Sequence, residues 1–311
     1  MNKVAEPEFS YTFLLPKYWG IWLGFGLMFL ITLLPYRLIY RIGLSLEPLI
    51  KKFLKRRHLI AKKNLEICFP DMSKTQQAEL LEKNIQSVAL AIVETAIAWF
   101  WPDWRIQQHI SYTGLEHIEK AKQEGKGVLL IAIHALHLEL GARAYGVKNP
   151  GVGVYRPNDN PLYDWIQFKG RVRSNKYMVD RRDIRGMLHA LKDGESVWYA
   201  PDHDYGRHRS VFVPLFAENK TCTTTGTHIL AGRSKCKLIP YVLIRLPDAR
   251  GYQMRIFPAL ENYPYKDATS GAAFINKAIE HSIMQAPDQY MWMHRRFKHQ
   301  EDEHAPSVYT K

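Results

Sequence analysis

The sequence predicts an α/β protein with a largely parallel sheet flanked by helices. From residue 127 onward, short apolar runs alternate with helix-length amphipathic segments, as in βαβ units. The first run, residues 128–133, is continuously apolar, as expected of a parallel strand buried on both faces. A third observation is the uncharged stretch 18–36, which is long enough for a membrane helix of roughly 30 Å.

The composition is that of a globular protein with a marked positive charge. The 311 residues include 43 Lys and Arg against 30 Asp and Glu, which gives a net charge of +13. This charge favours an anionic partner such as a membrane face, an acidic protein or a phosphorylated substrate. A mean hydropathy of −0.29 argues against a polytopic membrane protein. Three cysteines without a CxxC pair argue against a disulfide framework and a zinc ribbon, and favour a reducing compartment.

The stretch 18–36 predicts a transmembrane or membrane-anchor helix with aromatic residues at both ends. A signal peptide fits poorly because no small-residue cleavage site follows, and a buried core helix is the other alternative. Seven positive residues follow the stretch within 37–57 and two precede it, which places the rest of the chain in the cytoplasm. We therefore expect a short tail (1–17), the anchor (18–36), a basic and amphipathic helical region (37–104) and an α/β catalytic domain (105–311).

The remaining elements follow from periodicity and capping. Ser73 and Gln76 have the spacing of a capping box, so a helix should begin there and end near Trp101, before a proline. The aromatic cluster of Trp99, Phe100, Trp101 and Trp104 is either core or a membrane-facing or acyl-chain surface. Strands are expected at 128–133, 152–155, 177–179, 197–200, 211–216, 238–244 and 252–259, and helices at 136–145, 162–172, 184–191, 224–231 and 271–285.

Polar residues follow three of the predicted strands. HALHLE (134–139), DRRD (180–183) and PDHDYGRHR (201–209) carry histidine, carboxylate and arginine at strand ends, where sites form in parallel sheets. His134 and Glu139 are five residues apart and can meet only if the chain turns between them. A strand followed by a helix supplies that turn. A carboxylate on one ring nitrogen would leave the other nitrogen as a base, so the pair is a candidate acid–base dyad.

Other enzyme signatures are missing from the sequence. There is no GxSxG elbow, GxxxxGK[ST] loop or GxGxxG fingerprint, so a serine hydrolase of that type and a nucleotide-binding protein are unsupported. A metal-dependent hydrolase built on His134, His137, Asp202 and His203 remains an alternative. So does a non-enzymatic protein that binds a membrane surface through its basic face. Nucleic-acid binding is the weakest alternative, because the sequence has no basic stripe within a recognised nucleic-acid-binding fold.

Several longer segments carry a resemblance to a known family. His134 and Glu139 match the H-x₄-D/E motif of glycerolipid-type acyltransferases. NLEICFPDMS (64–73), GVYRPNDNPL (153–162), GRVRSNKYMVDRRDIRGM (170–187), WYAPDHDYGRHRSVFVPLFA (198–217) and QYMWMHRRFK (289–298) extend the pattern. Together they resemble the late acyltransferases of lipid A biosynthesis, most closely the Kdo-dependent lauroyl branch, from about residue 11 to 310.

The resemblance implies a glycerolipid-acyltransferase-like fold and a location at the bacterial inner membrane, with the catalytic domain in the cytoplasm. It implies transfer of an acyl chain, lauroyl or alternatively palmitoleoyl or myristoyl, from acyl carrier protein to a hydroxyl of the Kdo-bearing lipid A precursor, without a metal or cofactor. His134 is then the expected base, oriented by Glu139. Arg181 is expected to stabilise the thioester oxygen or bind an acceptor phosphate.

Two further residues are expected in substrate binding. Arg171 is a second candidate for the role of Arg181, and Asp202 should position an arginine or a loop. His137 lies inside the motif, where the family would have an apolar or hydroxyl residue.

Overall fold

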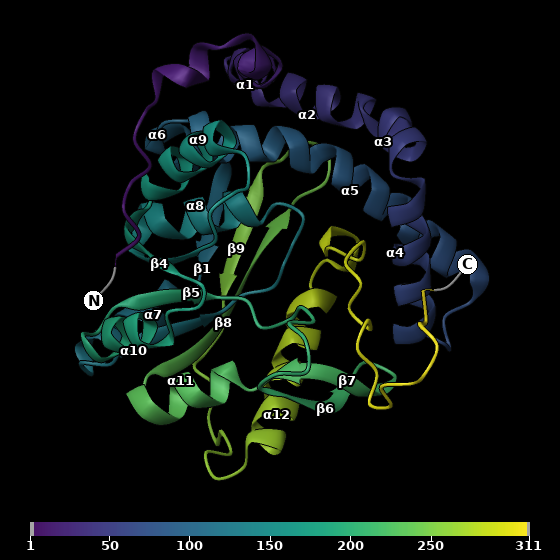
Figure 1. Cartoon of the computed structure of the whole chain (residues 1–311), viewed down its shortest axis with the longest axis vertical. Coiled ribbons are helices and arrows are strands. Elements are labelled where there is room, and N and C mark those ends of the chain that lie inside the picture. The colour runs from purple at the N-terminus through teal and green to yellow at the C-terminus, as the bar shows by residue number, and fades with distance from the viewer. Residues whose placement is uncertain (1–2, 310–311) are drawn as a thin grey trace.

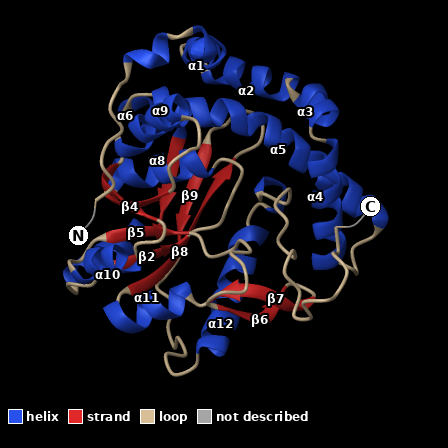
Figure 2. Cartoon of the chain, viewed as in Figure 1, coloured by secondary structure: helices blue, strands red, loops and turns tan. Residues whose placement is uncertain are grey.

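A seven-stranded sheet lies at the centre of the protein (Figures 1 and 2). The structure is a computed structural model and describes residues 3–309. The strand order is β1-β9-β8-β2-β5-β3-β4, and every neighbouring pair is parallel except β8 and β9. The strands are β1 (Ile110–Thr113), β2 (Val128–Ile131), β3 (Gly151–Tyr155), β4 (Asn175–Asp180), β5 (Ser196–Tyr199), β8 (Lys237–Arg245) and β9 (Tyr252–Ile256). The predicted α/β class with a largely parallel sheet is confirmed.

Helices connect and flank these strands. They are α7 (Leu115–Gln123), α8 (Leu138–Lys148), α9 (Pro161–Val172), α10 (Ile184–Lys192), α11 (Gly226–Ser234) and α12 (Ala268–Met284). Polar side chains cap three of their N-termini: Asn160 for α9, Asp183 for α10 and Asp267 for α12. The helix expected from residue 136 begins two residues later, because residues 132–137 form the turn that leaves β2.

A long helix, α5 (Lys74–Phe100), crosses the molecule beside the sheet (Figure 1). The capping box of Ser73 and Gln76 is confirmed, and the helix ends before Pro102 as expected. The aromatic cluster at its end is divided: Trp99 and Trp101 are buried in the core, whereas Trp104 is exposed.

The N-terminal segments lie along α5 (Figure 1) and correct one prediction. They are η1 (Tyr11–Leu14), η2 (Pro16–Tyr18), α1 (Trp19–Thr32), α2 (Tyr36–Ser45), α3 (Glu47–Phe53) and α4 (Lys55–Cys68), with α6 (Asp103–His109) after α5. The 14 residues of α1 extend about 21 Å, short of the roughly 30 Å hydrocarbon core. Pro35 then precedes the first residue of a separate helix, α2. Among residues 3–309 no helix has the length and apolarity needed to cross a membrane, so the predicted transmembrane helix is not found.

A hairpin outside the main sheet carries the strand expected at 211–216. It pairs β6 (Ser210–Leu215) with β7 (Glu218–Thr224) in antiparallel fashion. The sequence did not predict β7, because ENKTCTT has little apolar character. After η3 (Pro287–Gln289) the C-terminal segment returns between α12 and α4 (Figure 1). There Asn84 of α5 donates to the carbonyls of Asp288 and Tyr290, both at 2.8 Å.

Candidate active site

Two neighbouring parallel strands bring a histidine and an aspartate together. β2 and β5 pair in register from Val128–Ser196 to Ile131–Tyr199, so the loops after them leave the same edge of the sheet. The first loop carries His134 and the second Asp202. Nδ1 of His134 lies 2.7 Å from Oδ1 of Asp202, and the backbone N–H of His134 donates to Oδ2 at 2.8 Å. One buried carboxylate therefore fixes both the ring and the backbone of His134.

The charge of Asp202 determines the tautomer of His134. Burial alone would raise the pKa of Asp202, but the neighbouring His134 ring and the hydrogen bonds from His134 hold it well below its usual range. As a carboxylate, Asp202 only accepts hydrogen bonds, so Nδ1 of His134 carries the proton. In the neutral ring Nε2 is then the nitrogen without a proton and can act as a base, as in a His–Asp pair of a hydrolase triad. Asp202 was expected to position an arginine or a loop. Its partner is instead the imidazole.

Glu139 does not occupy the place that the sequence analysis gave it. It lies in the first turn of α8 and binds Arg171 of α9, whose Nε is 3.1 Å from both carboxylate oxygens and whose Nη2 contacts Oε1. The indole N–H of Trp99 donates to Oε2 at 2.9 Å. The turn at 132–137 directs Glu139 toward α5 and α9 instead of toward the His134 ring. The expected pairing of His134 with Glu139 is replaced by the pairing with Asp202.

Glu139 and Arg171 form an ion pair in which both side chains carry their charge. Burial alone would raise the pKa of Glu139, but the charge of Arg171 and the hydrogen bonds from Arg171 and Trp99 bring it below its ordinary value. Both side chains are therefore charged. Arg171 also lies over the ring of Tyr155, 5.6 Å from its centroid.

His134 opens into a large cleft with a basic mouth. The cleft spans about 1800 Å³, part of it open to solvent, and His134, His203, Tyr199 and Trp198 are among the residues that line it. Arg156, Arg181, Arg182 and Arg209 line it as exposed side chains. Among the described residues, Arg181, Arg182 and Arg209 form no ion pair with a carboxylate, so their charges are available to an anionic ligand. The structure thus places Arg181 and Arg171 in the cleft that contains His134.

A second cavity adjoins the cleft and is mainly apolar. It spans about 520 Å³, part of it open to solvent, and most of its lining is apolar: Ala98, Trp99, Ala142, Gly153, Met178 and Trp198, with the polar side chains of Glu139, Arg143, Arg171 and Asn175 also contributing. Leu138, Val154, Arg171 and Trp198 line both spaces. These four side chains therefore form the boundary between a polar cleft and an apolar chamber.

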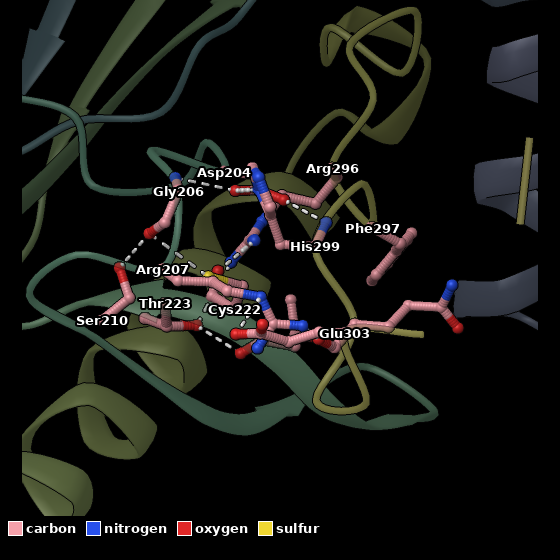
Figure 3. Close-up of polar contacts among 12 residues, drawn as sticks. Asp204, Gly206, Arg207, Ser210, Cys222, Thr223, Arg296, Phe297, His299 and Glu303 are labelled. Atoms are coloured by element: carbon pink, nitrogen blue, oxygen red, sulfur yellow. Dashed lines mark hydrogen bonds and ion pairs between the residues drawn. The ribbon is translucent and has the colours of Figure 1, made fainter. Parts of the chain in front are cut away.

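The loop after β5 is held on its other side by the C-terminal segment (Figure 3). Asp204 accepts from the backbone N–H of His299 at 2.8 Å and lies 2.7 Å from its Nδ1, the same two contacts that Asp202 makes with His134. Arg296 donates to the carbonyl of Cys222 at 2.6 Å. Between the two aspartates, the ring of His203 stacks on that of His134 with 3.5 Å between centroids. The loop is therefore fixed at three consecutive residues.

His137 is not part of the cleft. Its side chain is 1% exposed, and its Nε2 lies 2.8 Å from Oε1 of Gln289. Burial lowers its pKa, so it is a neutral core residue. The second histidine of the motif thus packs under the turn that carries the first.

The geometry of His134, Asp202 and His203 argues against a metal site. Their donor atoms lie within 4.8 Å of one another. However, both oxygens of Asp202 already accept from His134, and the two imidazoles stack face to face. Metal ligands instead direct ring nitrogens at a common point. The donor set therefore fits a hydrogen-bonded acid–base pair better than a cation.

Two residues that reach the site from the C-terminal segment were not predicted from the sequence. His294 stacks on His203, and His299 binds Asp204. His203 and Trp99 were noted in the sequence, but not their contacts with His134 and Glu139. The density of histidine and aspartate in PDHDYGRHR was a signal for the loop after β5, but nothing in the sequence says that His294 and His299 reach it.

Comparison with known proteins gives the chemistry of this site. Residues 6–299 match the family model described as bacterial lipid A biosynthesis acyltransferase. The chain is 52% identical to a lipid A biosynthesis lauroyltransferase of Escherichia coli, over 97% of this chain and 99% of that protein. It is 47% identical to a lipid A biosynthesis acyltransferase of Haemophilus influenzae (99% and 100%) and 43% identical to the E. coli palmitoleoyltransferase (94% and 95%). With its sheet-edge histidine, basic cleft and full-length similarity, the chain belongs to the bacterial lipid A biosynthesis acyltransferases and is an acyltransferase.

Proposed function

We propose that this enzyme transfers a lauroyl group from acyl carrier protein to a hydroxyl of the Kdo-bearing lipid IV(A) precursor. The observation that carries the proposal is the His134–Asp202 pair, which lies in a cleft that has an arginine-lined mouth and an apolar chamber adjoining it. The high identity to a lauroyltransferase favours the lauroyl donor over palmitoleoyl and myristoyl. The acceptor is phosphorylated and the carrier protein is acidic, which suits a chain of net charge +13.

The chemistry is a direct transfer without an acyl-enzyme. Nε2 of His134 accepts the proton of the acceptor hydroxyl as that oxygen attacks the thioester carbonyl carbon. Asp202 stabilises the imidazolium that forms. When the tetrahedral intermediate collapses, the carbon–sulfur bond breaks and the imidazolium returns its proton to the departing thiolate. Atoms and charge balance without a metal or another cofactor.

We assign the binding of the developing oxyanion and of the acceptor phosphates to two of the arginines that line the cleft, Arg181 and Arg171. Arg181 is exposed and free of ion pairs among the described residues, so it can bind the thioester oxygen or an acceptor phosphate. Arg171 is held by Glu139 at the boundary of the apolar chamber, close to where an acyl chain would enter. In this proposal Glu139 acts through Arg171 and Trp99. It is a positioning residue.

The apolar chamber is the proposed place for the acyl chain. Its walls are mostly carbon, and it adjoins the cleft at Leu138, Val154 and Trp198. Trp198 and Leu138 then separate the chain from the polar cleft. The thioester would lie at this boundary, beside His134.

We propose that α1 holds the enzyme at the inner membrane from the cytoplasmic side. Trp19, Leu23, Leu27 and Leu30 lie three or four residues apart on this helix and are each more than half exposed, whereas Phe25 and Thr32 are buried against the protein. A helix with one apolar face outward and the other packed can lie in the headgroup region. The basic residues of α3 and α4 then face anionic lipids.

The decisive experiment is mass spectrometry of the Kdo-bearing precursor after incubation with a panel of acyl carrier protein thioesters. A mass gain of one lauroyl group, with slower transfer from longer donors, is expected. Transfer only from coenzyme A esters, or preferential transfer of palmitoleoyl, would overturn the donor assignment. The metal-dependent hydrolase alternative is tested in the same assay, because chelation should leave transfer unchanged.

A further inference from the structure

Three imidazole rings form a stack that begins in the wall of the cleft and that we call the histidine column: His134, His203 and His294. The ring centroids of His134 and His203 lie 3.5 Å apart with planes at 13°, and those of His203 and His294 lie 3.7 Å apart with planes at 7°. The three residues come from the end of β2, the loop after β5 and the C-terminal segment. Such contact distances leave no room for water between the rings.

The two inner members of the column are neutral for a geometric reason. Nε2 of His203 and Nε2 of His294 are buried, and neither has a hydrogen-bond partner among residues 3–309. An imidazolium carries an N–H at both nitrogens, so protonation would bury a donor without an acceptor. Burial, together with the adjacent His134, lowers the pKa of His203 to about 2, and the same two causes lower that of His294 to about 4.

The charged and titratable neighbours of the column come from two segments, the loop after β5 and the C-terminal segment. Asp202 precedes His203 and is committed to His134, while Asp204 follows and is committed to His299. Arg296, on the C-terminal segment, opposes protonation of both inner rings. The ring of Tyr205 lies 6.4 Å from His203. These groups leave His134 as the member of the column whose free nitrogen faces the cleft.

We propose that His203 is a positioning residue for the general base, with a neutral ring, backed by His294, that fixes the plane of His134 and stabilises its imidazolium during proton transfer. This inference rests on the proposed function, in which His134 is the base. A cation within about 6 Å of an aromatic face is attracted to its π electrons, most strongly where water is excluded. The column therefore favours the charged form of His134, which exists only while the acceptor proton is in transit.

The test is the pH profile of kcat/KM for lauroyl transfer, measured on the full-length chain. His203→Leu fills the space but removes the π face. The protonated form of His134 loses an attraction, so the acidic limb should move to lower pH by about half a unit to one and a half units. The plateau should fall by a similar factor of about 3 to 30. His203→Phe restores an aromatic face and should keep the wild-type limb. His294→Leu should move the limb in the same direction by less.

A readout without substrate separates this inference from the proposed function. Ring signals of His134 can be titrated by NMR in the full-length protein, with the His134→Gln spectrum as assignment and the exposed His304→Leu as matched control. The titration midpoint of His134 should fall in His203→Leu and should keep its wild-type value in His203→Phe and His304→Leu. If His203→Leu lowers the plateau but leaves the limb and the NMR midpoint in place, the ring only fills space and the inference is wrong. If the NMR midpoint of His134 moves but His134→Gln still transfers acyl groups, the effect of the histidine column on His134 is supported, but His134 is not the base.

Discussion

At the scale of single residues, the His134–Asp202 pair makes the sharpest prediction. His134→Ala removes the base and Asp202→Asn removes the charge that fixes its tautomer, so each should lower kcat by about 10²–10⁴-fold. The loss of kcat in the double variant should be far less than the product of the two single losses, because the two residues act as a unit. The measurement is acyl transfer to the lipid A precursor, on variants shown to be folded by thermal melting. The matched control is the buried neighbour His137→Ala, whose turnover should stay within a few-fold of wild type. If His137→Ala abolishes transfer while His134→Ala retains it, the base is misassigned.

The Glu139–Arg171 pair leads to a prediction about stability as well as activity. Glu139→Gln leaves the guanidinium of Arg171 without its carboxylate and should cost about 1–3 kcal/mol of folding free energy. Adding Arg171→Met removes the stranded charge, so the double variant should melt at a higher temperature than Glu139→Gln alone while remaining poorly active. Calorimetry and the transfer assay separate the two effects. Equal melting temperatures for the single and double variants would contradict the pairing.

The role of Arg181 can be assigned from the separate effects of its removal on kcat and on KM. If it stabilises the thioester oxygen in the transition state, Arg181→Ala should lower kcat by about 10²-fold or more. If it binds an acceptor phosphate equally in ground and transition states, KM should rise while kcat is kept. The neighbouring Arg182→Ala, also on the cleft, is the matched control. Wild-type kinetics in Arg181→Ala would remove this residue from the site.

At the scale of elements, the C-terminal segment completes the site although it contributes little regular structure. Its backbone accepts hydrogen bonds from α5, its His299 binds Asp204 and its His294 ends the histidine column. The loop after β5 therefore has a rigid support on the side away from the cleft. Catalytic loops need such support, since a displacement of about 1 Å can cost about 10²-fold in rate.

The helix α1 carries the element-scale prediction. Leu23→Glu and Leu27→Glu place charges on its outward face, so binding to vesicles of anionic phospholipid should weaken by about tenfold or more. Transfer to a detergent-dispersed acceptor should be nearly unchanged. Co-sedimentation with vesicles measures the first quantity and the mass-spectrometric assay the second. Ile92→Glu, an exposed apolar position on α5, is the control. Unchanged vesicle binding in both α1 variants would refute the anchoring role.

At the scale of the whole molecule, the proposed anchoring places both ends of the chain on one side of the membrane. Because α1 packs along α5, a reporter fused before Met1 and one fused after Lys311 should both behave as cytoplasmic. A single-pass arrangement, as the sequence suggested, would instead put the N-terminal reporter in the periplasm. Paired cytoplasmic and periplasmic reporters at both ends measure this directly. Periplasmic activity at either end would contradict the proposed placement.

The sequence by itself determined the α/β class, most strand positions and the identity of the family. Buried parallel strands are apolar throughout, so residues 128–131 and 238–244 were evident from composition. The capping box of Ser73 and Gln76 was equally local, since its two partners lie three residues apart. His134 was identified as a candidate because a strand end and a motif coincide there.

Only the tertiary structure decided which carboxylate serves His134. Five residues separate it from Glu139 and 68 separate it from Asp202, yet the pairing of β2 with β5 brings the distant residue to the ring and the turn before α8 carries the near one away. The same holds for the histidine column, whose members lie up to 160 positions apart, and for α1, whose end at Thr32 depends on packing and on Pro35. Local patterns fix elements because their forces act between sequence neighbours. A site at a sheet edge is fixed by strand order, which no local pattern records.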